Sequence, residues 1–190
     1  MVRWMTSISI AAKASRDIKS HVATLEADYG PAGAHAACAL VKLAYAGPHH
    51  RANMVGVGAM KPLVQLLRDG AAAGGGPGFS AVDAACKIVG VLAYDGSAIA
   101  RVLVTAGVAQ PLVALLSTDA AAAAALAIQT LLTKAGPLAA FSKAHAPLRR
   151  LLLDGASDDR ARYAAGSALS ALDEGLGRDA ARLLRIVTPS

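Results

Sequence analysis

The chain has 190 residues, of which 55% are hydrophobic and only 4% aromatic, and it carries a formal net charge of +6. This length suits one domain of ordinary size, and its two cysteines are too few for a disulfide-built scaffold. The positive charge favours acidic partners in general, although solubility alone also explains it. Alanine, the strongest helix former, is abundant and no alternating strand pattern stands out, so the composition predicts closely packed helices.

The first 32 residues are predicted to form an N-terminal helix that acts as a partial repeat or cap. Ile18, Val22 and Leu25 recur on one face of such a helix. The first turns are also basic and rich in serine, which is typical of organelle transit peptides, and this alternative stays open. We otherwise expect an intracellular protein, cytoplasmic or nuclear. Cys38 and Cys86 are then reduced residues that pack between helices.

A Pro-Leu-x-x-Leu-Leu motif occurs three times, beginning at Pro62, Pro111 and Pro147. These prolines are 49 and 36 residues apart, and the mean falls inside the ~40–47-residue period of helical solenoid repeats. Gly58 and Gly107 each lie four residues before a motif proline. Glycine there can end one helix in the left-handed conformation, and proline is tolerated in the first turn of the next. The motif therefore predicts a short helix, a sharp turn and a second helix with a buried leucine stripe.

A second pattern, Ala-x3-aliphatic-x2-Leu, predicts a longer third helix in each unit. It begins at Ala36, Ala85, Ala124 and Ala165, with successive shifts of 49, 39 and 41 residues. Spacings of four and then three place the patterned residues on one helix face. The first shift is long because residues 70–78 form a glycine-rich insertion, which is predicted to be flexible.

These segments resemble the armadillo repeat family. Residues 53–67 are similar to the family's first and second helices, residues 103–108 to the turn between them, and residues 36–44 to its third helix. The resemblance covers residues 33–174, and it departs from the family at Lys143, where the third unit should have glycine. It implies an all-α fold, a right-handed α-solenoid of three to four armadillo-like repeats, with a HEAT-like solenoid as the alternative.

The predicted layout is a single repeat domain over residues 1–190. After the N-terminal segment 1–32, the repeats occupy residues 33–174, with full units at 48–95, 97–134 and 136–174. Residues 176–190 are predicted to form a separate capping helix and tail. The long uncharged run at 102–118 contains glycine and proline, so we interpret it as a central repeat and expect no membrane insertion.

No pattern in the sequence points to catalysis. The five histidines lack metal-ligand spacing with cysteine or carboxylate, and no nucleophile signature is present. Asp158 and Asp159 fit the cap of a helix better than a pair of opposed catalytic carboxylates. The glycine-rich segment lacks the Lys and Ser or Thr of a phosphate loop. We therefore expect no enzyme activity and no catalytic, cofactor or metal site.

The resemblance implies a partner-binding groove along the stacked third helices. In peptide-clamping members of the family, asparagine on this helix holds the ligand backbone, often with tryptophan one turn earlier. The asparagine position falls here at Lys42, Val91, Thr130 and Ala171, and the tryptophan position falls at Cys38, Lys87, Leu126 and Ser167. Neither residue type occurs at any of them, which speaks against an importin-alpha-like clamp for basic nuclear signals.

Lys42 and Lys87 bring positive charge into this predicted groove, unless both are merely solvated. We therefore expect a non-catalytic protein-interaction scaffold that binds an extended segment of a partner protein, acidic or phosphorylated in character. One alternative is a basic helical solenoid that binds nucleic acid, since basic residues cluster at Arg149, Arg150, Arg160 and Arg162. Another is the substrate-recognition portion of a larger ubiquitin ligase.

Overall fold

The computed structural model describes residues 2–28, 30–74, 79–136, 139–154 and 158–187. Within these ranges the chain forms ten α-helices, one short 3₁₀ helix and no strand. In chain order the helices are α1 (Val2–Ala27), α2 (Pro31–Ala46), α3 (Pro48–Gly56), α4 (Met60–Ala73), α5 (Phe79–Tyr94), α6 (Ser97–Thr105), α7 (Ala109–Leu115), α8 (Ala121–Ala135), η1 (Ala139–Ala144), α9 (His145–Leu153) and α10 (Asp159–Val187).

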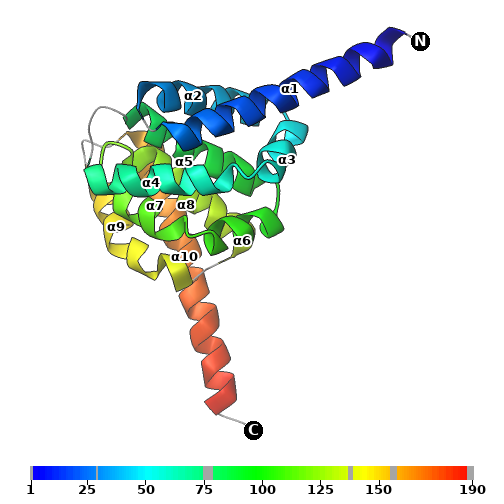
Figure 1. The fold of residues 1–190 in the computed structure, drawn as a ribbon. Coiled ribbons are helices and arrows are strands. Elements are labelled where there is room, and N and C mark those ends of the chain that lie inside the picture. Colours follow the sequence, from blue (N-terminus) through cyan, green and yellow to red (C-terminus); the bar gives the residue numbers. More distant parts are fainter. Residues whose placement is uncertain (1, 29, 75–78, 137–138, 155–157, 188–190) are drawn as a thin grey trace.

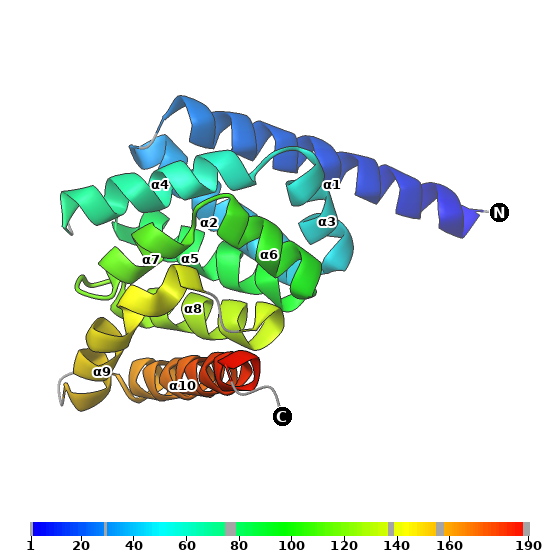
Figure 2. The same cartoon turned by 90° about the horizontal axis from the view of Figure 1, so that it is seen from below.

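The helices stack in successive layers, as Figures 1 and 2 show. Helices α2, α5, α8 and α10 pack each on the next, and α4 and α7 pack beside them in a second row that α9 continues. Helix α1 covers the N-terminal end of the stack. Each layer buries its apolar face only against its neighbours, which is the mechanical basis of a solenoid. The predicted all-α solenoid is confirmed.

The proline-leucine motif forms the second row of helices. The motif proline is the third residue of α4, α7 and α9. Backbone N–H groups in the first turn of a helix have no carbonyl acceptor within that helix, so the N–H that proline lacks costs no hydrogen bond there. The motif leucines of the first two copies are buried. In the third copy Leu148 and Leu151 are buried, but Leu152 is exposed. The motif thus marks the inner wall of the stack, with one departure at its C-terminal end.

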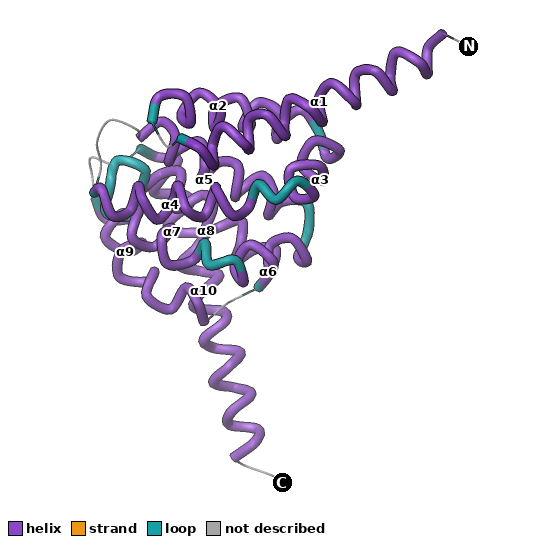
Figure 3. Tube along the Cα trace, in the orientation of Figure 1, coloured by secondary structure: helices purple, strands orange, loops and turns teal. Residues whose placement is uncertain are grey.

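The turns between the first and second helices depend on glycine. Gly58 has φ +82° and Gly107 has φ +92°, both in the left-handed region that favours glycine. These turns are the short loops between α3 and α4 and between α6 and α7 in Figure 3. In the third unit, where Lys143 replaces the glycine, η1 runs directly into α9. A residue with a Cβ avoids positive φ, and Lys143 accordingly does not adopt the left-handed conformation that Gly58 and Gly107 have.

The predicted flexible insertion at residues 70–78 is shorter than expected. Helix α4 continues to Ala73, and Gly74 ends it at φ +65°. Gly70 is buried inside α4, and a Cβ built on it would lie 2.3 Å from Cγ2 of Val82 on α5. Gly70 is therefore a packing residue that lets two helices approach closely, and residues 75–78 lie outside the described residues.

The predicted separate capping helix is also wrong, because α10 runs from Asp159 to Val187 without a break. A helix tolerates an internal glycine at a cost of about 1 kcal/mol, so Gly175 and Gly177 do not end it. Figure 1 shows the C-terminal part of α10 leaving the stack, as the N-terminal part of α1 does at the other end. The side chains expected to face the core after residue 174 lie outside the described residues.

No single helix in the described ranges is both long and apolar enough to cross a membrane. Helices α6 and α7 meet that test only as a pair, and they are bent by 83° at the break between them. Leu103, Val108 and Leu112 of this segment are fully buried in the stack. The uncharged run at 102–118 thus supplies the core of a central layer.

Candidate functional site

A furrow of about 610 Å³ lies between α5 and α8. Small residues form its floor, since Gly90 of α5 and Ala127 of α8 let the two helices approach closely. A Cβ built on Gly90 would lie 3.6 Å from the Cα of Ala127. The walls carry the larger half-buried side chains of Val91 and Leu126. The result is a mostly apolar furrow on the face formed by the third helices of the repeat units, which are α2, α5, α8 and α10.

Four of the eight sequence-predicted groove residues line this furrow. Lys87 and Val91 contribute from α5, and Leu126 and Thr130 contribute from α8. The other four lie on the neighbouring third helices and are not among the lining residues. Cys38 and Lys42 are exposed on α2, whereas Ser167 and Ala171 are half-buried on α10.

The two hydroxyl groups at the predicted groove positions already form hydrogen bonds within the protein. The Thr130 hydroxyl donates to the carbonyl of Leu126 at 2.9 Å, within its own helix. The Ser167 hydroxyl accepts from Nε2 of Gln129 at 3.1 Å, which ties α10 to α8. Ser167 therefore serves the contact between two layers, as well as occupying a predicted groove position.

The two predicted groove lysines differ in their electrostatics. Nζ of Lys87 lies 2.5 Å from Oδ2 of Asp83, one turn earlier on α5, so much of its charge is balanced locally. Lys42 is exposed on α2 and forms no ion pair within the described residues. The positive character expected from both lysines therefore rests on Lys42.

Two exposed tyrosines close one end of the furrow, and the sequence analysis missed them. Tyr45 is the next-to-last residue of α2 and is 62% exposed, and Tyr94 is the last residue of α5 and is 66% exposed. Both line the furrow, and Nζ of Lys134 on α8 lies 4.3 Å from the Tyr94 ring centroid. The sequence does contain a repeat that could have identified them. Leu-Ala-Tyr-x-Gly occurs at 43–47 and again at 92–96, and this spacing of 49 residues is also that of the first two proline-leucine motifs.

Arg51 braces this end of the furrow. Its guanidinium donates from Nε and Nη2 to the two carboxylate oxygens of Asp95, each at 2.6 Å, and from Nη1 to the carbonyl of Ala44 at 2.9 Å. The hydrogen bond with Asp95 raises the pKa of Arg51, and partial desolvation opposes that rise. The bidentate pair joins α3 to Asp95 at the carboxyl end of α5, and the bond to the Ala44 carbonyl joins α3 to the last turn of α2.

The opposite end of the furrow carries balanced charge. Asp158 and Arg160 line it, and Oδ1 of Asp158 accepts from the backbone amide of Arg160 at 3.4 Å, consistent with the predicted helix cap. Arg162 forms an ion pair with Asp159. Two members of the basic cluster predicted from the sequence, Arg160 and Arg162, are therefore interleaved with carboxylates at the start of α10, whereas Arg149 and Arg150 lie exposed on α9.

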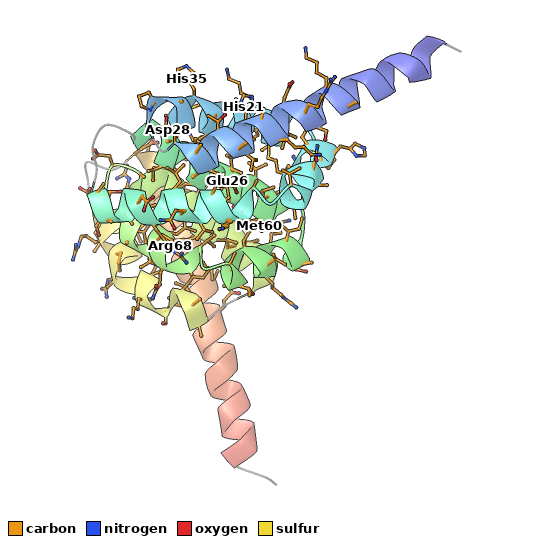
Figure 4. The ribbon with its side chains drawn as sticks, viewed as in Figure 1. His21, Glu26, Asp28, His35, Met60 and Arg68 are labelled. Carbon is orange, nitrogen blue, oxygen red and sulfur yellow. The ribbon has the colours of Figure 1, made fainter. Side chains whose placement is uncertain are left out.

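Within the described residues, no group of three His, Cys, Asp or Glu side chains is placed to hold a metal ion. Figure 4 shows His21 and His35 at the edge of the stack, on α1 and α2. Cys86 is buried, and this burial raises the pKa of its thiol, which disfavours the reactive thiolate. Cys38 is exposed, so the prediction that it packs between helices is wrong.

No protein-family model and no curated protein sequence matches the chain. Solved structures do. A designed armadillo repeat protein is 25% identical with a TM-score of 0.66, over 82% of this chain and 64% of that one. A second, described as computationally designed for modular peptide recognition, is 24% identical with a TM-score of 0.64, over 80% of this chain and 62% of that one.

A third designed armadillo repeat protein, solved with the peptide (KR)4, is 21% identical with a TM-score of 0.66. That match covers 93% of this chain and 84% of the other. The chain spans less than two thirds of the length of the first two. These likenesses show an armadillo-repeat-like fold.

Proposed function

We propose that this armadillo-repeat-like solenoid is a non-catalytic scaffold that binds an extended segment of another protein in the furrow between α5 and α8. The observation that carries the proposal is the convergence of four third-helix positions on one open, mostly apolar furrow. Binding grooves for extended segments combine apolar area with a few polar groups that fix orientation. Two structural neighbours, one designed for modular peptide recognition and one solved with a bound peptide, support the same kind of function.

The proposed segment is acidic. Lys42 is exposed on α2, one turn before the furrow-lining Tyr45, and it has no ion-pair partner among the described residues; Lys134 lies over the Tyr94 ring. Lys87 and Arg51 contribute less, because Asp83 and Asp95 balance their charges. Exposed charges of one sign steer oppositely charged partners and reject like-charged ones.

Nucleic-acid binding is the less supported alternative. In the basic cluster that suggests it, Arg162 pairs with Asp159 and Asp158 lies beside Arg160, which leaves Arg149 and Arg150 of α9 as its exposed remainder. A steep dependence of RNA or DNA binding on salt concentration would return this alternative to consideration.

The test is a selection from a random peptide-display library, followed by affinity measurements on two matched variants. Thr130→Trp fills the furrow. Thr105→Trp is its control, because Thr105 is exposed on α6 and makes the same hydrogen bond to the carbonyl four residues earlier. Selected peptides should bind the wild type and the control equally and the furrow variant about tenfold or more weakly. No enriched peptide, or equal binding to both variants, would refute furrow binding.

Acidic preference is tested separately by charge reversal. Lys42→Glu with Lys87→Glu removes positive charge from the groove face. Lys61→Glu with Arg101→Glu makes the same net change at exposed sites on α4 and α6. The first pair of substitutions should weaken the binding of the selected peptides, and the second pair should not. An equal loss of affinity in both variants would show that the preference depends only on the net charge of the protein, and not on the groove lysines.

A further inference from the structure

We infer that Tyr45 and Tyr94 form a receptor for one apolar side chain of the bound segment, and that this receptor selects an apolar residue flanked by acidic ones. The inference rests on the proposed function, because it names the chemistry that the furrow recognises. We call Tyr45 and Tyr94 the tyrosine pair.

The tyrosine pair is placed by the repeat. The two residues are 49 positions apart, occupy the last turns of α2 and α5, and line the same furrow. Helices α2 and α5 pack directly on each other. Packed helix axes lie about 8–10 Å apart, and a carbon atom makes its best contact at about 3.5–4.0 Å. Rings held at that axial spacing would admit a single side chain between them.

The exposure of the pair indicates an unfilled contact surface. Both tyrosines are more than three-fifths exposed, and they lie at one end of a furrow whose floor is apolar. A tyrosine can bury a large apolar area while its hydroxyl stays hydrogen-bonded, which is why tyrosine is enriched among residues that dominate binding. Arg51 holds the carboxyl ends of both helices, so the rings stand on a braced support.

The surrounding charges decide which side chain fits. Lys134 belongs to α8, on the far side of α5 from α2, and its Nζ already covers the Tyr94 ring. Lys42 lies on α2 one turn before Tyr45. Aromatic faces attract cations as well as apolar groups, but a cationic guest here would meet two ammonium groups. An aliphatic guest meets no such repulsion, and carboxylates on either side of it can reach the two lysines.

The experiment compares three short synthetic peptides by fluorescence anisotropy. The first has a central leucine between glutamates, the second a central glycine between glutamates, and the third a central leucine between lysines. The wild type should bind the first about tenfold more tightly than either of the others. The double variant Tyr45→Ala, Tyr94→Ala should lose the preference for leucine over glycine. The double variant Tyr45→Phe, Tyr94→Phe should keep that preference, because the ring faces remain.

Equal binding of the leucine and glycine peptides to the wild type, or a leucine preference that survives in the alanine variant, would overturn the inference. Equal weakening of both glutamate peptides by the alanine variant would also overturn it, since that pattern indicates a structural role. The proposed function fails separately, when the display selection yields no peptide whose binding depends on Thr130. Furrow-dependent peptides that lack an apolar residue beside acidic ones would overturn only the inference about the tyrosine pair.

Discussion

Replacing Gly70 by alanine tests how closely α4 and α5 pack. A Cβ on Gly70 would lie 2.3 Å from Cγ2 and 3.0 Å from Cγ1 of Val82, whereas favourable carbon contacts begin near ~3.5 Å. The two helices would have to separate by about an ångström, or Val82 would leave its rotamer, and such overpacking costs about 1–3 kcal/mol. Alanine recovers at most about 1 kcal/mol of helix propensity. We therefore expect a net loss of about 1–2 kcal/mol.

Two other glycines separate this steric effect from backbone effects. Gly56 ends α3 at negative φ with nothing within 4 Å of its ideal Cβ, so Gly56→Ala should change stability by less than about 0.5 kcal/mol. Gly58 has equally open space but φ +82°, so Gly58→Ala should cost about 1–2 kcal/mol through backbone strain alone. Urea unfolding followed by far-ultraviolet circular dichroism measures all three free energies.

A double-mutant cycle with Val82→Ala identifies the contact. Val82 is 4% exposed, and its truncation alone should cost about 1.5–3 kcal/mol. The double variant should be more stable than the sum of the single losses predicts, by about 1 kcal/mol or more, because the valine methyl groups that the added Cβ would meet are gone. Additive losses would refute the steric explanation, and a Gly70→Ala protein as stable as the wild type would refute the close approach itself.

Three further outcomes are expected. Leu169→Ala should cost about 2–5 kcal/mol in urea unfolding, because Leu169 is only 9% exposed, and a loss below about 1 kcal/mol would contradict its place in the core. Arg51→Ala should cost about 1–3 kcal/mol by leaving Asp95 and a carbonyl of α2 without their donor, and Arg51→Lys should restore only part of this, since lysine lacks the planar fork. Maleimide should modify Cys38 but not Cys86 in the native protein and both after denaturation, so two adducts on the native protein by mass spectrometry would contradict the burial of Cys86.

The architecture of this protein can be predicted from its sequence alone. Proline, glycine and leucine at fixed offsets predict the second helices and the turns before them, because these residues act through local backbone geometry and through the periodicity of one helix face. The structure agrees with that prediction, because the turn glycines Gly58 and Gly107 are left-handed and the motif leucines Leu63 and Leu112 are buried. The end of α4 and the continuity of α10 were not predictable, because glycine lowers helix propensity without forbidding a helix.

The surface that the third helices present to a partner depends on how the helices pack. Sequence register places Lys87, Val91, Leu126 and Thr130 on equivalent positions, but only packing of α5 against α8 places them along one furrow. Within the described residues, Lys87 is balanced by Asp83 whereas Lys42 has no ion-pair partner. Packing also assembles the tyrosine pair and Arg51 from segments distant in the chain. Periodicity fixes which side of a helix is buried, whereas the width of a furrow and the sign of its charge depend on neighbours that no local pattern specifies.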